Sequence, residues 1–186
     1  MAVDAAADAA RARGESIVSG KAPAASGGLP AIVVLEPKAA GELPAQAARP
    51  VMDQISQVFT PPVMFVRTGQ PAEFRNSDET LHNIRVRNED TKQAAFNIAL
   101  PTGQTFEYAF NEDGFYDVGC DIHPAMSAVI VASRSPYTAL AAADGSFSVE
   151  NVPAGSYGLT IYADVRKIVR TIDVTPGRTD LGAVTP

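Results

Sequence analysis

A run of eight residues in the later part of the chain, Gly119-Cys-Asp-Ile-His-Pro-Ala-Met126, places three metal-binding side chains at three-residue intervals. Cys120 offers a thiolate, His123 an imidazole and Met126 a thioether. The chain has one cysteine and two histidines in all, so the second imidazole can come only from His82. Two imidazoles and a thiolate in one plane, with a weak thioether on the axis, are the ligands of a type 1 copper ion. We therefore predict that one copper ion is bound by His82, Cys120, His123 and Met126.

The chemistry of such a site is the transfer of single electrons. Cu(I) prefers soft ligands in low coordination numbers, whereas Cu(II) prefers tetragonal nitrogen and oxygen donors. A rigid intermediate geometry suits both states and lowers the reorganisation that accompanies electron transfer. The sequence thus favours a one-electron carrier that cycles between Cu(I) and Cu(II). We expect no catalytic residues and no enzyme activity.

Other interpretations of the same residues remain open at this point. A buried cysteine and a methionine can be ordinary core residues when each is taken alone. Zinc also binds cysteine and histidine, but a structural zinc site usually has more of them, and methionine is a poor zinc ligand. A Cys120–His123 nucleophile pair would suggest an enzyme, yet the sequence shows no oxyanion-hole or substrate-binding motif.

The composition is that of an ordinary globular protein with an acidic surface. The chain has 186 residues, of which 46% are hydrophobic and 19% charged, and its net charge is −6. A nucleic-acid-binding protein would carry a basic patch, whereas the fifteen Lys and Arg residues here are scattered. No window approaches the roughly 20 apolar residues that span a bilayer. We therefore expect neither a nucleic-acid partner nor a membrane span.

Short strands bounded by turn residues run through almost the whole chain. Period-two alternation, typical of half-buried strands, is clearest in Ala72–Asn76, His82–Arg87 and Thr105–Phe110. Asp144-Gly145 and Pro153-Ala-Gly155 are turn signals. No segment after residue 16 shows a helical period, and residues 1–15 are an Ala-rich stretch that we expect to be a flexible lead-in, either a frayed helix or disordered. The pattern predicts an all-β protein made of sandwiches.

The metal-binding residues, together with their flanking motifs, resemble a cupredoxin, the type 1 blue copper family. The segment from Val63 to Ala132 carries the family pattern: Val66-Arg-Thr-Gly69, Phe74-Arg-Asn-Ser-Asp78, His82-Asn83 and Gly114-Phe-Tyr116, followed by the three ligands of the loop. The Cys-x-x-His-Pro-x-Met spacing is closest to that of amicyanin, while plastocyanin and pseudoazurin have a longer gap before the methionine. The resemblance implies a Greek-key β-sandwich over residues 50–134. Its first strand would come from Val51-Met-Asp-Gln54.

The resemblance also implies roles for single residues. His82 and His123 would be the equatorial nitrogen ligands, Cys120 the equatorial thiolate and Met126 the axial ligand. Asn83 matches a family asparagine that forms hydrogen bonds between the two ligand loops. The histidine of the C-terminal loop would reach the surface through an apolar patch where redox partner proteins dock, to which Leu81, Pro124 and Ala125 would contribute.

The tail resembles a second family, the carboxypeptidase regulatory-like sandwiches of the transthyretin type. The similar motifs are Ala143-Asp-Gly-Ser-Phe147 and Asn151-Val-Pro-Ala-Gly-Ser-Tyr157, with Val18-Ser-Gly20 and Ala31-Ile-Val-Val-Leu35 as the opening strands. We therefore predict a second small sandwich made of residues 16–40 and 135–186, into which the cupredoxin is inserted. One enlarged cupredoxin with additions at both ends is the simpler alternative. The combination is similar to bacterial methylamine-utilisation-type proteins.

Type 1 copper proteins work in the periplasm or outside the cell, so the resemblance implies export. The N-terminus, Met1-Ala-Val-Asp-Ala-Ala-Ala-Asp, lacks the basic start and apolar run of a signal peptide; we expect a mature exported chain. Two functions compete with electron transfer: copper carriage or storage, and a non-redox role as an interaction module. The redox partners, the reduction potential and the oligomeric state do not follow from the sequence.

Overall fold

The computed structural model describes residues 5–24, 28–164 and 166–185. The chain divides into two compact units. The central unit is Leu43–Pro136, and the flanking unit is formed by the chain up to Glu42 together with the chain from Tyr137 onward. Within these described ranges every regular element after a short N-terminal helix is a strand, which confirms the predicted all-β class. No helix among the described residues has the length and apolar character needed to cross a membrane.

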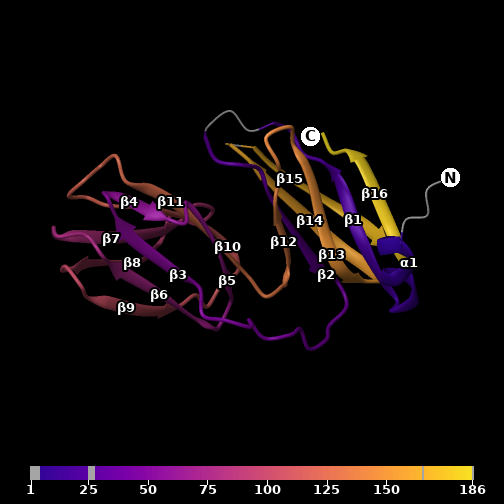
Figure 1. The fold of residues 1–186 in the computed structure, drawn as a ribbon, viewed down its shortest axis with the longest axis horizontal. Coiled ribbons are helices and arrows are strands. Elements are labelled where there is room, and N and C mark those ends of the chain that lie inside the picture. Colours follow the sequence, from indigo (N-terminus) through magenta and orange to yellow (C-terminus); the bar gives the residue numbers. More distant parts are fainter. Residues whose placement is uncertain (1–4, 25–27, 165, 186) are drawn as a thin grey trace. The chain divides into compact units, whose positions relative to one another are not determined.

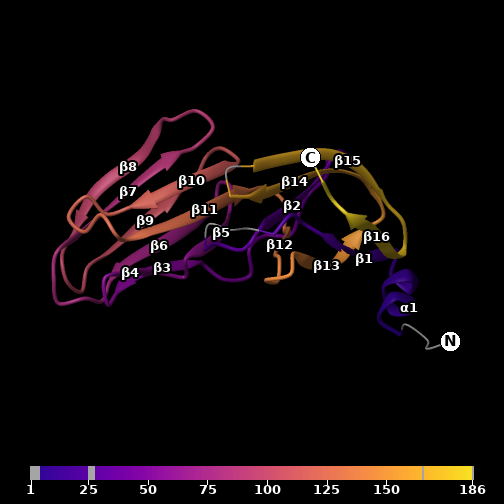
Figure 2. The same ribbon diagram turned by 90° about the horizontal axis from the view of Figure 1, so that it is seen from above.

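The central unit contains two sheets. One has the strand order β5-β11-β10-β7-β8 and the other β4-β3-β6-β9, an order that can be followed in Figure 2. The strands of the first sheet are β5 (Val63–Arg67), β7 (His82–Asn88), β8 (Ala94–Leu100), β10 (Gly114–Gly119) and β11 (Ser127–Ser133). Those of the second are β3 (Val51–Ile55), β4 (Val58–Thr60), β6 (Pro71–Asn76) and β9 (Thr105–Ala109). The pairs β5–β11 and β3–β6 are parallel, and all other pairs are antiparallel.

The core of this unit consists of residues that alternate along strands of both sheets. Its fully buried members include Met52, Phe74, Ile84, Val118 and Ile130. In β6 and β7 the buried positions recur every second residue, because successive side chains of a strand point to opposite faces. The same alternation carries β10 onward to Cys120, which belongs to the buried cluster. The metal-site thiol therefore lies at one end of the core.

The flanking unit is a second arrangement of two sheets. The first has the order β13-β1-β16 and the second β12-β2-β14-β15. Their bounds are β1 (Glu15–Lys21), β2 (Ile32–Pro37), β12 (Tyr137–Leu140), β13 (Ser146–Pro153), β14 (Gly155–Ala163), β15 (Arg166–Val174) and β16 (Gly177–Ala183). A separate buried cluster, which includes Val18, Leu35, Val152, Leu159 and Ile161, fills this unit. Strands from before and after the central unit thus share one core (Figure 1).

Of the two alternatives for residues 1–15, the structure shows the helix, which is packed and not frayed over its middle. Residues Ala5–Ala12 form the helix α1, which packs against β16 and β1 (Figure 1). Alanine has the highest helix propensity, and the small side chains of Ala7 and Ala10 are buried in this contact. Composition alone did not reveal that a sheet surface was available to cover them. Residues 1–4 of the predicted lead-in lie outside the described residues.

Gly145 lies in the turn that connects β12 to β13, two strands that belong to different sheets of the flanking unit. Its φ is +85°, and a Cβ atom there would lie 2.3 Å from the carbonyl oxygen of Ala22. We expect Gly145→Ala to destabilise this unit by about 2 kcal/mol or more, since a left-handed alanine costs about 1–2 kcal/mol before any clash. The measurement is hydrogen exchange of the β1 and β13 amides.

Gly158 provides the matched control for this prediction. It lies in the same unit, has no positive φ, and its added Cβ would meet nothing closer than 3.8 Å. Gly158→Ala should leave the exchange of β1 and β13 unchanged to within about 0.5 kcal/mol. Equal effects of the two substitutions would show that the turn at Gly145 does not limit the stability of the unit.

Candidate metal centre

His82 is the first residue of β7 and pairs with Leu100 of β8. Its side chain has no exposed surface. The β8 ladder reaches His82 itself, whereas the ladder with β10 holds the later part of β7, from Arg85 to Asn88. A histidine at the first residue of a strand thus lies at the end of the core, where the loops meet.

The other three predicted ligands come from the loop between β10 and β11. These strands pair as far as Gly119 and Ser127, so the segment 120–126 must turn back over a short distance. The backbone N–H of Met126 donates to the carbonyl of His123 at 2.9 Å, which tightens the loop. Cys120 enters the loop directly from the buried face of β10 and is 2% exposed.

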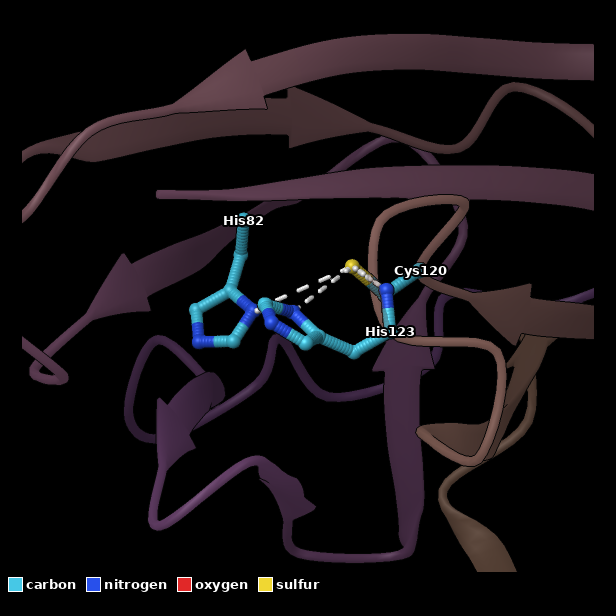
Figure 3. A group of neighbouring side chains, drawn as sticks. All are labelled: His82, Cys120 and His123. Carbon is cyan, nitrogen blue, oxygen red and sulfur yellow. Dashed lines mark hydrogen bonds between the residues drawn. The ribbon is translucent and has the colours of Figure 1, made fainter. Parts of the chain in front are cut away.

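The donor atoms of His82, Cys120 and His123 converge (Figure 3). Cys120 Sγ lies 3.8 Å from His82 Nδ1 and 3.9 Å from His123 Nδ1, and the two Nδ1 atoms are 2.9 Å apart. All three donor atoms lie within 4.8 Å of one another. The structure thus brings together the predicted equatorial residues, although His82 and Cys120 are 38 positions apart in the sequence.

These separations fit a single metal ion. A first-row ion bound in a plane by two imidazole nitrogens at about 2.0 Å and a sulfur at about 2.3 Å would separate its ligands by about 3.5–3.8 Å. The nitrogen–sulfur distances of 3.8 and 3.9 Å lie at the upper end of this range or just above it, and the two nitrogens, now 2.9 Å apart, would separate by about 0.6 Å to admit the ion. Two imidazoles and one thiolate are the equatorial set of a type 1 copper site, so the residues present fit copper.

Met126 is the fourth predicted ligand, and its side chain is buried. It is 2% exposed and belongs to the same buried cluster as Cys120. A buried thioether that follows His123 by three residues is well suited to an axial position. Its assignment as the axial ligand stays a prediction.

Asn83 connects the two ligand segments. Its Oδ1 accepts hydrogen bonds from the amides of Asp121 at 2.6 Å and Ile122 at 3.3 Å, and from the thiol of Cys120 at 3.3 Å. Its Nδ2 donates to Asn97 Oδ1 and to Asp121 Oδ2, both at 2.9 Å. One mostly buried amide side chain therefore ties the β7 end to the start of the metal-binding loop. The contacts are of the kind predicted for this residue.

Three charged neighbours of the site were not assigned a role from the sequence. Asp121 Oδ1 forms an ion pair with Arg85 Nε at 3.0 Å. The Oδ2 atom of Asp78 lies 2.9 Å from His82 Nε2. Burial raises the pKa of Asp78, but hydrogen bonds from Gln57, His82 and Ser56 outweigh this and lower it below its usual value. The i, i+4 spacing of Asp78 and His82 was the available signal.

Exposed apolar residues adjoin both histidine ligands in the sequence, and His123 itself is partly buried. The predicted patch residues Leu81, Pro124 and Ala125 are all exposed. Ile122, which sequence reasoning missed, is as exposed as Leu81, each at 47%. One exposed large apolar side chain therefore precedes each histidine ligand, Leu81 before His82 and Ile122 before His123.

Two family models match parts of the chain. The model described as "Copper binding proteins, plastocyanin/azurin family" matches residues 48–132, and the model described as "Polysaccharide lyase family 4, domain II" matches residues 126–181. The first match confirms the predicted cupredoxin domain and copper as its cofactor. The second indicates a fibronectin-type-III-like domain in the tail, and the carboxypeptidase regulatory-like assignment stays a prediction. No curated relative matches the chain.

Several solved structures are similar to part of the chain. A purple cupredoxin from Nitrosopumilus maritimus is 24% identical, with 45% of this chain and 99% of that chain covered and a TM-score of 0.41. Amicyanin from Paracoccus versutus is 22% identical over 54% of this chain and 97% of that chain, with a TM-score of 0.42. A copper-containing nitrite reductase from Thermus scotoductus SA-01 is 23% identical, with a TM-score of 0.43; the match covers 54% of this chain but only 26% of the reductase.

Proposed function

We propose that this chain, whose residues 48–132 form a cupredoxin domain, carries single electrons between redox partner proteins and catalyses no reaction of its own. The observation that carries the proposal is the triangle formed by the Nδ1 atoms of His82 and His123 and the Sγ atom of Cys120. Copper bound there would accept and release one electron. The chain contributes a donor set that both oxidation states can share.

Rigidity of the protein around the site supports this function. His82 and Cys120 are almost completely buried, and Asn83 holds the loop that carries Cys120 and His123. The amide of His123 also donates to Cys120 Sγ at 3.4 Å, which keeps the sulfur in place. Ligands held in this way do not need to move far when the charge of the site changes.

His123 is the ligand through which electrons would reach the surface. Unlike His82 it is only partly buried. The exposed apolar residues Ile122, Pro124 and Ala125 adjoin it in the sequence, and Leu81, also exposed, adjoins His82; we call these four residues the apolar patch. We infer that a redox partner docks on this patch. A carrier that hands over copper itself would need an accessible thiolate, whereas Cys120 is 2% exposed.

Leu81→Lys is expected to slow electron self-exchange between copper-loaded copies about tenfold at low ionic strength, without changing the reduction potential. Self-exchange brings two like patches together, so a lysine on each adds like-charge repulsion. The rate is measured by NMR line broadening in mixtures of the Cu(I) and Cu(II) forms. Val169→Lys is the control, because Val169 is 64% exposed and lies in the flanking unit.

The proposed function as a whole is tested by voltammetry of the copper-loaded protein. An electron carrier should show a reversible one-electron couple and should retain its copper in both states. Loss of the metal on each reduction would instead support copper carriage, and the absence of any couple would support a non-redox interaction module. We further propose that the protein acts in the periplasm or outside the cell, where cupredoxins work.

A further inference from the structure

The carboxylate of Asp78 lies between the buried ligand His82 and the turn of a hairpin. Its Oδ2 is 2.9 Å from His82 Nε2 and accepts a hydrogen bond from the amide of Gln57 at 2.8 Å. Its Oδ1 accepts from the amide of Ser56 at 2.5 Å. One side chain therefore contacts an imidazole and two backbone amides that belong to a different part of the chain.

This arrangement determines which nitrogen of His82 carries the proton. A backbone amide can only donate, so both carboxylate oxygens of Asp78 act as acceptors. The Nε2 atom of His82, which contacts Oδ2, must then be the donor, so the imidazole carries its proton on Nε2. The Nδ1 atom is left with its lone pair, and it is this atom that faces Cys120 Sγ and His123 Nδ1.

Asp78 is itself held firmly. Its amide donates to Asn76 Oδ1 at 3.0 Å, while Asn76 Nδ2 donates to the carbonyls of Thr80 and Leu100 at 2.9 and 2.7 Å. Asn76 is 1% exposed. The loop that leads to His82 is thus built around a buried amide side chain, and the carboxylate cannot easily turn away from the imidazole.

The hairpin turn depends on the same carboxylate. Ser56 and Gln57 form the two-residue connection between β3 and β4, and their φ values are +55° and +57°. Such turns usually contain Asn-Gly, because residues other than Gly, Asn and Asp are strained in this conformation. Here the two amides of the turn point at Asp78, which compensates for the unfavourable residues.

We propose that Asp78 is a positioning residue for the copper site, which fixes the tautomer and ring orientation of His82 and makes its Nδ1 a stronger donor. The inference rests on the proposed function. A carboxylate that accepts from the distal N–H raises the basicity of a metal-binding imidazole. The effect is larger for Cu(II) than for Cu(I), because Cu(II) has the higher charge, so Asp78 favours the oxidised state.

The test is Asp78→Asn in the copper-loaded protein. The amide is similar in shape but neutral, and we expect it to lower the ratio of Cu(II) to Cu(I) affinity about tenfold. For a one-electron couple this is a rise in reduction potential of about 59 mV. Because the variant also disturbs the turn, it is made together with Ser56→Asn and Gln57→Gly. An Asn-Gly turn adopts this conformation without the stabilising carboxylate of Asp78. The reference for this measurement is the protein with the turn substitutions alone.

Asp53→Asn is the matched control. Asp53 accepts hydrogen bonds from the amide and hydroxyl of Ser77, in the same loop, at 3.2 and 2.8 Å. These hydrogen bonds of Asp53 go to Ser77 and not to His82, so Asp53→Asn should leave the ratio of Cu(II) to Cu(I) affinity, and with it the reduction potential, unchanged. A potential of the Asp78 variant equal to that of the control would overturn the proposal.

A second measurement does not depend on copper. Long-range ¹H–¹⁵N correlation spectra of the apo-protein report the tautomer of each histidine, and we expect His82 in the Nε2–H form. If Asp78→Asn fails to fold, the spectrum of the unaltered apo-protein still decides, and an Nδ1–H tautomer would contradict the proposal. If the protein fails to form a blue copper site, the proposed function fails, while the tautomer separately tests the role of Asp78.

Discussion

Replacement of Cys120 by serine is expected to abolish the intense thiolate-to-copper absorption and to lower the affinity for Cu(I) at least about 100-fold. Cys120 is the one cysteine of the chain, so no other thiolate can replace it. A hydroxyl is a hard, neutral donor at neutral pH, and Cu(I) selects soft ligands. The variant keeps the two imidazoles and should still bind Cu(II) weakly, with the spectrum of a nitrogen- and oxygen-bound ion.

The affinity is measured by competition with a chromophoric Cu(I) chelator. Cys120 is buried, so Cys120→Ser also removes a small apolar group from the core. Far-UV circular dichroism of the apo-variant shows whether the fold is retained, and only a folded variant is compared. A folded variant that kept the intense band or the Cu(I) affinity would show that the sulfur is not a ligand.

Asn83→Ala is expected to have the largest effect on stability of any single change near the site, about 2–4 kcal/mol. The substitution removes the acceptor of the Asp121 and Ile122 amides and both donors of the side chain. Leaving a buried donor without a partner costs about 1–3 kcal/mol. Urea unfolding of the apo-protein measures the loss, with hydrogen exchange of the 120–126 amides as a local readout.

Asn97→Ala is the control for this prediction. Asn97 accepts from Asn83 Nδ2 at 2.9 Å and donates to the same Asp121 carboxylate at 3.0 Å, but it is exposed, so water can replace it at both contacts. Its replacement should cost no more than about 0.5 kcal/mol. Equal losses for Asn83→Ala and Asn97→Ala would mean that the surface contacts of Asp121, and not the buried bridge, hold the loop.

The ligand residues could be predicted from the sequence because three of them are close together in the chain and because cysteine and histidine are rare in it. Cys120, His123 and Met126 lie in one loop, and His82 is the only other histidine. For Asp78 the sequence offers only the i, i+4 spacing to His82, which does not by itself establish the role of the carboxylate. That role depends on the turn at Ser56 and Gln57, more than 20 positions earlier, and nothing in the sequence pattern brings that turn to the metal site.

The strands that could be predicted are those with an amphipathic pattern, such as β7 and β14, where buried and less buried residues alternate. The strands β8 and β16 were missed. Their sequences, AAFNIAL and GRTDLGA, alternate poorly or are largely polar. They become strands because β7 and β1 offer them unpaired edges, and pairing of this kind is decided by tertiary structure and not by local propensity.

The most direct test of a type 1 copper site is the addition of one equivalent of Cu(II) to the apo-protein, followed by visible absorption and electron paramagnetic resonance. The triangle of His82, Cys120 and His123 predicts an intense visible band and a narrow copper hyperfine splitting at a stoichiometry of one. A pale complex with a wide splitting, like that of aqueous or backbone-bound Cu(II), would contradict the assignment. The cluster would then be a set of buried side chains without a redox metal.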